Sequence, residues 1–294
     1  TLFLVCFHLV FFPLFRLGFI MIAKELRSMS AQKFWKTKLA AFLHDPPDKC
    51  LDIAGHEQAA EHFQIGAGLV NPGDYDGWAV KAADVFTAAA DRFGFPKGKC
   101  ATIYKETGTG AFIHPLSSTA YELDIPDLLA RAGEVHGILQ SAIHGIDPDD
   151  AQTTLFLYWR RWLENSVTSL PTISRELAFL PADTRIPDHT IWQHNAMASA
   201  LAGCAVNGKL QPALLLFQLG GVQEFISQAR STRDLWSGSY LLSWLMAHAM
   251  KAVSDQVGAD AVVFPNLRGN GIFDALHRES IYEKKIFISQ DKRQ

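Results

Sequence analysis

Apolar side chains recur at helical spacing through most of residues 30–208. Between residues 30 and 43 they lie three or four positions apart, so that they share one face of an amphipathic helix. The same spacing predicts helices over residues 50–65, 78–93, 125–144 and 149–166. The helix over residues 78–93 is rich in alanine, which permits close packing against a neighbouring helix. The first two-thirds of the chain are therefore expected to be mostly helical.

The pattern changes after Gly208. Residues 212–219 form a short continuous apolar run before two glycines, which predicts a buried strand. Helical patterns follow over residues 222–230 and 238–253, and residues 261–265 predict a second strand. A strand, helix, strand order is typical of an α/β domain.

The chain has 294 residues, enough for roughly two domains with separate cores. We expect a helical domain over residues 29–208, with an insertion of short strands and turns near residues 94–124. Residues 209–294 are expected to form an α/β domain whose sheet is incomplete.

Residues 1–28 form an apolar leader that does not match this picture. Their length approaches that of a membrane span, but His8, Pro13 and Arg16 weaken a spanning helix. No basic region precedes the apolar run and no small-residue cleavage site follows it, which disfavours a signal peptide. We interpret the leader as upstream-translated sequence before a natural start at Met21 or Met29, with a membrane anchor as the alternative.

Composition and charge exclude some classes of protein. Apolar residues make up 48% and charged residues 19% of the chain, which is typical of a globular protein. The net charge of −3 provides no general positive field for a polyanion. Four widely spaced cysteines without a Cys-x-x-Cys pair disfavour a disulfide framework, so that a reducing, cytoplasmic setting is the simplest.

The main candidate for chemistry is the pair His44 and Asp45, at the end of the helix over residues 30–43. An imidazole nitrogen and a carboxylate oxygen form a mixed ligand set that suits Mn, Fe, Ni or Zn and, more weakly, Mg. The alternative is that the pair is a common dipeptide, and that Pro46 and Pro47 only end the helix.

A metal site needs ligands from several helices, because one helix directs only two or three side chains to a point. The other candidates are His56, Asp84 and His194, each on a different expected helix, with Asp91 on the same helix face as Asp84. A histidine such as His194 on an apolar helix face is more often a core residue. Together these residue types indicate a metal-dependent hydrolase, in which the ion activates water and neutralises charge on a phosphoryl oxygen.

Lys49 follows His44 by five positions and is a candidate for stabilising the same developing charge. It could equally be a solvated lysine at a helix start.

Two further motifs favour structural roles. Residues 158–162 combine three aromatic residues with two arginines. We expect a buried helix there with its arginines at the surface, in preference to a base-stacking surface. Gly220 and Gly221 favour a tight turn, and Arg230 and Arg233 before a helix favour an ordinary N-cap over a phosphate site.

Three stretches resemble the large subunit of type III-B CRISPR–Cas effector complexes, the Cmr branch. They are Leu-His-Asp-Pro-Pro-Asp-Lys within residues 38–49, Ile-Trp-Gln-His within residues 185–194, and Gly-Gly-Val-Gln-Glu-Phe-Ile followed by the Ala-Arg to Ser-Tyr-Leu-Leu-Ser region over residues 220–243. They occur in the family's order, and the resemblance covers roughly residues 33–275.

The resemblance implies a circularly permuted histidine–aspartate (HD) domain that degrades single-stranded DNA with a divalent metal such as Mn, Ni or Mg. His44 and Asp45 match the family's namesake pair, and His194 matches by its Ile-Trp-x-His context. Asp84 resembles the final aspartate ligand, with Asp91 as the rival, and His56 is the least direct match. Some family members have a degenerate nuclease site.

The family's second half contains two ferredoxin-like palm domains, the latter with a Gly-Gly-Asp-Asp motif that makes cyclic oligoadenylates from ATP. Residues 210–294 resemble the opening of the first palm, and Gly-Gly-Asp-Asp is absent from this sequence. The resemblance therefore implies an N-terminal fragment, with ATP bound only by the missing half.

The implied partners are other CRISPR effector subunits, guide and target RNA indirectly, and single-stranded DNA as substrate, with no membrane. The alternatives are an inactive scaffold subunit, a stand-alone nucleotide phosphohydrolase and an anchored membrane protein.

Overall fold

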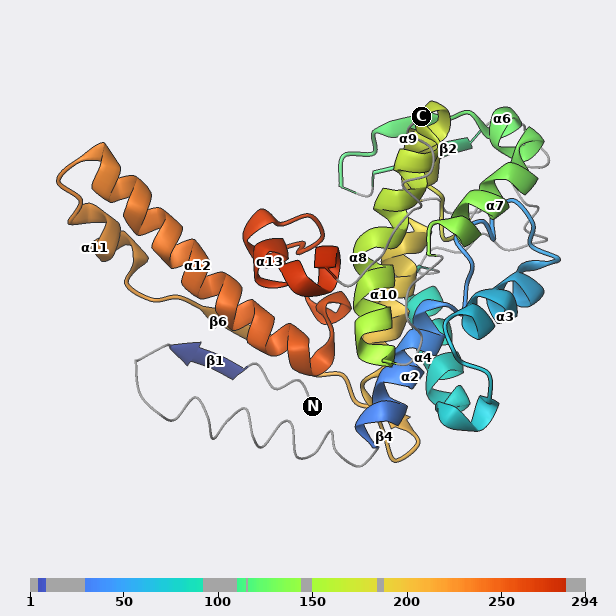
Figure 1. The fold of residues 1–294 in the computed structure, drawn as a ribbon, viewed down its shortest axis with the longest axis horizontal. Helices are drawn as coiled ribbons and strands as arrows, with labels where there is room; N and C mark the ends of the chain where they lie inside the picture. Colours follow the sequence, from blue (N-terminus) through green and yellow to red (C-terminus); the bar gives the residue numbers. More distant parts are fainter. Residues whose placement is uncertain are drawn as a thin grey trace.

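The chain folds as a helical body from which a long helical arm projects (Figure 1). The computed structural model describes residues 5–8, 30–91, 110–114, 116–143, 150–183 and 188–283. The body contains α2 (Ala31–Phe42), α3 (His56–Gly66), α4 (Gly77–Asp91), α6 (Ile125–Ala130), α7 (Ala132–Ser141), α8 (Ala151–Ser169), α9 (Ser174–Ala178) and α10 (Ile191–Ala202). The arm consists of α11 (Val222–Ser227) and α12 (Thr232–Val257), and α13 (Gly271–Leu276) lies between the arm and α8.

The strands form three separate pairs among the described residues. β2 (Gly110–Ile113) and β3 (Ala120–Leu123) are antiparallel, as are β4 (Ala205–Val206) and β5 (Lys209–Leu210). β6 (Leu215–Gln218) confirms a strand within residues 212–219, but the prediction that this strand is buried is wrong, because Leu215 and Leu216 are 42% and 56% exposed. It pairs in parallel with β1 (Val5–His8), so that part of the leader that the sequence analysis set apart contributes a strand. The rest of the leader and residues 92–109 of the expected insertion lie outside the described residues.

The expected helices are confirmed with three changes in their bounds. The second begins at His56, not at residue 50, and the helix expected over residues 125–144 divides at Arg131 into α6 and α7. α12 begins at Thr232, six residues before the expected start, because Ser231 caps it by accepting a hydrogen bond from the Asp234 amide.

The strand predicted over residues 261–265 is wrong. Residues Ala259–Ala261 form the short 3-10 helix η4, and no strand follows it before Pro265 in the described chain. Val263 and Phe264 are exposed, and proline has no N–H to donate to a sheet. The apolar run therefore lacks the partner strand that would have buried it.

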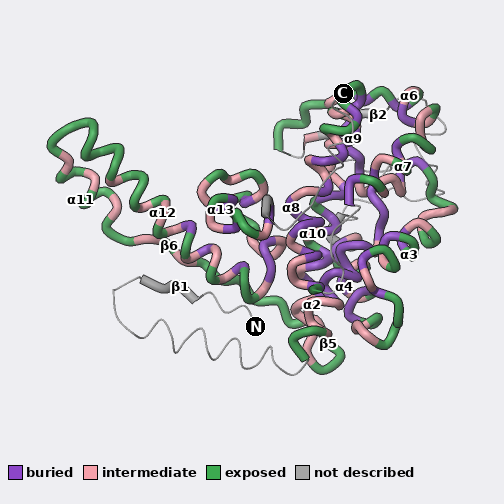
Figure 2. The backbone as a smooth tube through the Cα atoms, viewed as in Figure 1, coloured by how far each residue is buried: buried purple, intermediate pink, exposed green. Residues whose placement is uncertain are grey.

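The core lies where α8 and α10 cross α2, and it contains most of the buried residues (Figure 2). Trp162 of α8 packs edge-on against Trp192 of α10 and against Phe63 of α3. The two indole N–H groups donate to the carbonyls of Leu139 and Leu177. The aromatic residues of α8 are therefore core residues, as expected.

The expectation that both arginines of this stretch lie at the surface is wrong for Arg160. Arg160 is 5% exposed, and its guanidinium donates to both carboxylate oxygens of Asp274 at 2.9 and 2.5 Å. A second buried pair joins Lys38 of α2 to Asp260 of η4 at 2.7 Å. Two ion pairs thus connect the C-terminal region to the helical body.

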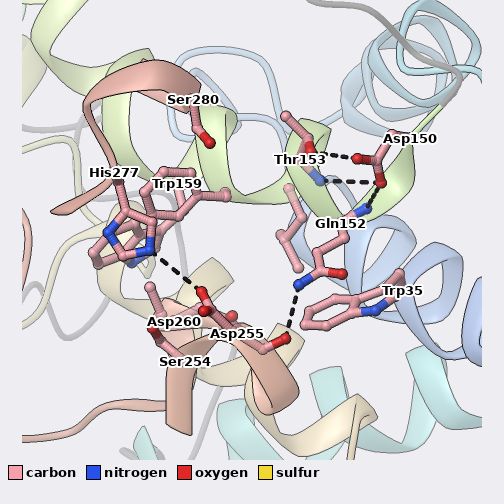
Figure 3. A pocket seen from close by; sticks show the side chains of 14 residues that line it. Trp35, Asp150, Gln152, Thr153, Trp159, Ser254, Asp255, Asp260, His277 and Ser280 are labelled. Atoms are coloured by element: carbon pink, nitrogen blue, oxygen red, sulfur yellow. Dashed lines mark hydrogen bonds and ion pairs between the residues drawn. The ribbon is translucent and has the colours of Figure 1, made fainter. Parts of the chain in front are cut away.

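A cavity of about 270 Å³ lies at this junction (Figure 3). Its walls combine aromatic rings, including Trp35 and Trp159, with the carboxylates of Asp150 and Asp255. Asp150 caps α8, and Asp255 is bonded to Lys251, so these carboxylates already have partners within the fold.

The outer part of the arm is exposed along most of its length (Figure 2). Trp236 is 76% exposed and Tyr240 is 58% exposed. Within the described residues, we find no helix that combines the length and the apolar character needed to cross a membrane.

We expect Asp274→Ala to lower the free energy of unfolding by about 3–5 kcal/mol, because the Arg160 charge then stays buried without this partner. Glu164 also accepts from Arg160 but is 45% exposed and compensates only partly. The measurement is urea denaturation followed by circular dichroism. The control, Asp127→Ala, breaks the exposed pair with Arg131, which also keeps Glu134 as a partner, and should leave the free energy of unfolding nearly unchanged. Equal effects of the two changes would contradict the structural role of the buried pair.

Candidate metal centre

Three helices that are distant in sequence meet closely in the body. α2, α4 and α10 pack pairwise against one another, and the residues at their contacts include several alanines. Small side chains let helix backbones approach, so that short side chains such as aspartate reach across the contact. The buried alanines are Ala40 and Ala41 of α2, Ala79 and Ala83 of α4, and Ala198 and Ala202 of α10.

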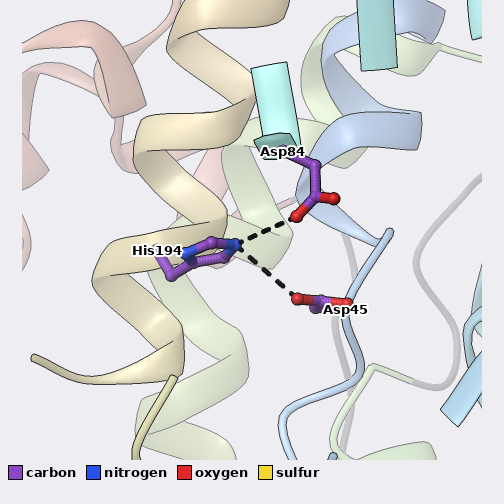
Figure 4. Close-up of side chains that lie close together, drawn as sticks. All are labelled: Asp45, Asp84 and His194. Atoms are coloured by element: carbon purple, nitrogen blue, oxygen red, sulfur yellow. Dashed lines mark ion pairs between the residues drawn. The ribbon is translucent and has the colours of Figure 1, made fainter. Parts of the chain in front are cut away.

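The contact brings together Asp45, Asp84 and His194 (Figure 4). Each offers one ligand atom, and these atoms lie within 4.8 Å of one another. His194 Nε2 is 3.6 Å from Asp45 Oδ2 and 3.5 Å from Asp84 Oδ1. The side chains of Asp45 and His194 are 5% and 6% exposed, so the group lies largely away from bulk water.

His44 lies next to this group and is more exposed to solvent than its three members. Its Nε2 is 3.5 Å from Asp84 Oδ2, and its side chain is 31% exposed. Burial by itself raises the pKa of the Asp84 carboxyl, but hydrogen bonds from His194 and His44 outweigh burial and hold that pKa well below its usual range. Asp84 is therefore ionised at neutral pH, as a metal ligand must be.

Lys49 pairs with Oδ2 of Asp45, the same carboxylate oxygen that lies near His194. Its Nζ donates to Asp45 Oδ2 at 2.6 Å, and its side chain is 28% exposed. The ammonium group therefore lies beside the candidate ligands, with partial access to solvent. The more exposed Lys81 lies 3.5 Å from Asp84 Oδ2.

The backbone of Asp45 is held from α10. Asn195 is 1% exposed, and its Nδ2 donates to the Asp45 carbonyl at 2.8 Å. Thr190 and Gln193 form a reciprocal capping box at the start of the same helix. α10 thus supplies both the His194 imidazole and the anchor for the turn that carries Asp45.

Of the two remaining candidates, His56 does not join this group, and the structure does not describe the side chain of Asp91. His56 begins α3, and its Nδ1 lies 2.6 Å from the Ile53 carbonyl. Asp91 ends α4, and its side chain lies outside the described residues.

Two histidines near these elements did not stand out in the sequence. His136 of α7 is 2.8 Å from Asp48 Oδ2, and Gln140 lies 2.7 Å from its other ring nitrogen. The His189 ring lies 6.1 Å from the His194 ring. The available signals were the i, i+4 spacing of His136 and Gln140 and a second histidine five positions before His194.

The donor set fits a divalent cation. Two carboxylates and one or two imidazoles provide negative charge together with nitrogen ligands, a combination that suits Mn, Fe, Ni or Zn better than Mg. The ligand atoms come from α4, from α10 and from the turn that follows α2, and the packing of these three helices limits how far the atoms can separate. An isolated surface ion pair would have neither feature.

Comparisons with known proteins find similarity to Cmr2 proteins of CRISPR systems. A family described as "CRISPR-associated protein Cmr2, N-terminal" matches residues 214–292, which include β6, the arm and α13. The match does not include the candidate metal group.

Two relatives extend the similarity over most of the chain. The "CRISPR system Cmr subunit Cmr2" of Pyrococcus furiosus is 28% identical over 286 residues, covering 81% of this chain and 32% of the relative. The "CRISPR system CMR subunit Cmr2" of Saccharolobus solfataricus is 26% identical over 276 residues, covering 87% of this chain and 26% of the relative. The chain thus spans about a third or less of the length of these relatives.

The described chain is mostly helical, and the matches place its similarity among CRISPR-associated proteins. The three sequence motifs, the family match and the two relatives agree on one member of that class. That member is Cmr2: the chain is similar, at 26–28% identity and over most of its length, to the Cmr2 subunits of two CRISPR Cmr systems.

We expect Asn195→Ala to weaken Mn²⁺ binding by roughly 10-fold, since partners that orient a ligand contribute about 10- to 100-fold to metal affinity. It should also lower the free energy of unfolding by about 1–3 kcal/mol, because the Asp45 carbonyl loses its buried donor. Isothermal titration calorimetry and urea denaturation measure the two effects. Asn71→Ala, at an exposed asparagine without a side-chain cap bond, is the matched control. Unchanged Mn²⁺ affinity in Asn195→Ala would exclude this anchoring role.

Proposed function

We propose that this chain carries the metal-dependent nuclease site of a Cmr large subunit, and that the site hydrolyses phosphodiester bonds of single-stranded DNA. The observation that supports the proposal most is the meeting of Asp45, Asp84 and His194 from separate parts of the sequence. The helical body is then an HD-type domain in permuted order, in which α10, the helix that carries His194, comes after the His44–Asp45 pair in the sequence.

The proposed ligands are Asp45, Asp84, His194 and His44, with Mn²⁺, Ni²⁺ or Mg²⁺ as the cation. When bound, the cation supplies Lewis acidity, which lowers the pKa of water and neutralises charge on a phosphoryl oxygen. The carboxylates of Asp45 and Asp84 hold the cation and are buried enough to exclude most competing water. The more exposed His44 lies on the side from which a substrate phosphate can approach.

Lys49 has the second proposed role. Its ammonium is tethered to Asp45 and is partly open to solvent, so that it lies where a scissile phosphate would meet the ligands. A positive group fixed near the developing charge stabilises a phosphoryl-transfer transition state. Asp45 would thus both bind the cation and position the lysine.

In the cell we propose that the chain acts with other subunits of a Cmr effector complex, which would bring guide RNA and target RNA to it indirectly. ATP-dependent synthesis of cyclic oligoadenylates is not assigned to these residues, because Gly-Gly-Asp-Asp is absent from the sequence. An inactive scaffold role is the second candidate, and the exposed apolar side chains of α12 favour it as a surface for assembly.

The first test is cleavage of end-labelled single-stranded DNA by the full chain with Mn²⁺. We expect cleavage that EDTA abolishes and added Mn²⁺ restores. The double variant His44→Ala, Asp45→Ala should lose at least about 100-fold in rate, since metal charge stabilisation contributes several kcal/mol. His62→Ala, at an exposed histidine of α3, is the control for loss of a histidine.

Parallel reactions with duplex DNA, single-stranded RNA and mononucleotides define the substrate class. Cleavage of mononucleotides in preference to DNA would favour the stand-alone phosphohydrolase. No cleavage by a folded, Mn²⁺-loaded chain would favour the scaffold.

A second test concerns Lys49 alone. Lys49→Met should lower kcat by roughly 10²- to 10³-fold, the usual effect of removing one group that stabilises transition-state charge. Its Mn²⁺ affinity should not fall, because the ammonium no longer competes for Asp45 Oδ2. Lys49→Arg keeps the charge and is the matched comparison. If Lys49→Met cleaves DNA at the rate of the unchanged chain, the lysine is only a solvated surface group.

A further inference from the structure

His189 lies beside His194 at the start of α10. The two ring centroids are 6.1 Å apart and the ring planes differ by 33°. Thr190 is the N-cap of α10, so His189 is the residue before the cap and His194 is the fourth residue of the helix. Side chains at these two positions commonly pack together and fix how the chain enters a helix.

His189 is itself held in place from two directions. Its Nδ1 lies 2.7 Å from Asp188 Oδ1, which restrains rotation of the ring. Its carbonyl accepts a hydrogen bond from the Ala182 amide at 3.2 Å, and the next residue, Thr190, forms a bridge with Pro181. The His189 side chain is only 21% exposed. The imidazole is therefore a fixed surface against which another ring can rest.

The orientation of the His194 ring matters for the candidate metal centre. Its Nε2 must point between Asp45 and Asp84, as it does at 3.6 and 3.5 Å. Rotation about the last side-chain torsion of histidine is broad and roughly two-fold, so the helix alone does not select this orientation. A second ring packed against the His194 imidazole restricts rotation about this torsion.

We propose that His189, held by Asp188, is a positioning residue that sets the orientation of the His194 imidazole. The spacing of 6.1 Å falls in the range of packed aromatic rings, which is about 4.5–7 Å. The pairing of Nδ1 with Asp188 orients the His189 ring for this contact. Direct ligation by His189 is the competing role, and the experiment below separates the two.

The first measurement is Mn²⁺ affinity by isothermal titration calorimetry on the full chain. We expect His189→Ala to weaken binding roughly 10-fold, within the range for groups that orient a ligand. His189→Phe keeps a packing ring without a ligand nitrogen, and it should restore the affinity to within about threefold of the unchanged chain. Gln193→Ala breaks the capping box at the same helix end but leaves both rings, so it should lower the melting temperature without a comparable loss of affinity.

The second measurement needs no metal. Diethyl pyrocarbonate modifies accessible histidines, and peptide mass spectrometry locates the modified positions. His194, which is 6% exposed, should be protected in the unchanged chain and in His189→Phe, but modified in His189→Ala. A merely structural loss of stability, as in Gln193→Ala, should not produce this pattern.

The affinity readout rests on the proposed metal centre, whereas the modification readout does not. If the unchanged chain binds no Mn²⁺, the proposed function fails, and modification of His194 alone decides the positioning role. Protection of His194 in His189→Ala would overturn that role. The positioning role would also be overturned if His189→Phe lost as much Mn²⁺ affinity as His189→Ala while His194 stayed protected from modification in His189→Phe. That result would identify His189 as a ligand.

Discussion

The approach of two carboxylates, Asp45 and Asp84, to one imidazole is the interaction on which the rest of the candidate site depends. Like charges in a partly buried space repel and are stable only with compensating positive groups. The Lys49 ammonium lies beside Asp45, and the His44 and His194 imidazoles lie beside Asp84, whose pKa their hydrogen bonds hold low against the effect of burial. The arrangement concentrates negative charge beside one imidazole, which is the donor set that a divalent cation requires.

Helix packing maintains this approach. The buried alanines of α2, α4 and α10 set the helix separation, and the Trp162–Trp192 contact fills the core beside them. α10 has three roles in the site. It carries His194, it holds the Asp45 backbone through Asn195, and a reciprocal capping box fixes its first turn. A change in how α10 packs would therefore affect the whole group at once.

The C-terminal region connects this body to the part that the Cmr2 family match covers. Arg160 forms an ion pair with Asp274, and Lys38 forms one with Asp260. Two positively charged side chains of the body are therefore paired with carboxylates that lie within residues 214–292. Removing one partner of such a pair leaves an unpaired buried charge, which is costly. The two pairs therefore favour this arrangement of the C-terminal region on the body over others, even if their net contribution to the free energy of unfolding is small. The arm extends from this junction with much of its apolar surface exposed.

The sequence by itself indicated the helical body, the end of α2 and the His44–Asp45 pair that follows it, because apolar spacing and proline chemistry act locally. It also singled out Asp84 and His194, but their meeting with Asp45 required three helices to pack. Local patterns failed where long-range partners decide the outcome: residues 261–265 found no strand to pair with, and Arg160 is buried because Asp274 lies opposite it. His189 likewise acquires its place only when α10 sets its ring against His194. Tertiary structure decided these points because burial, charge pairing and ring contacts join residues that the sequence keeps apart.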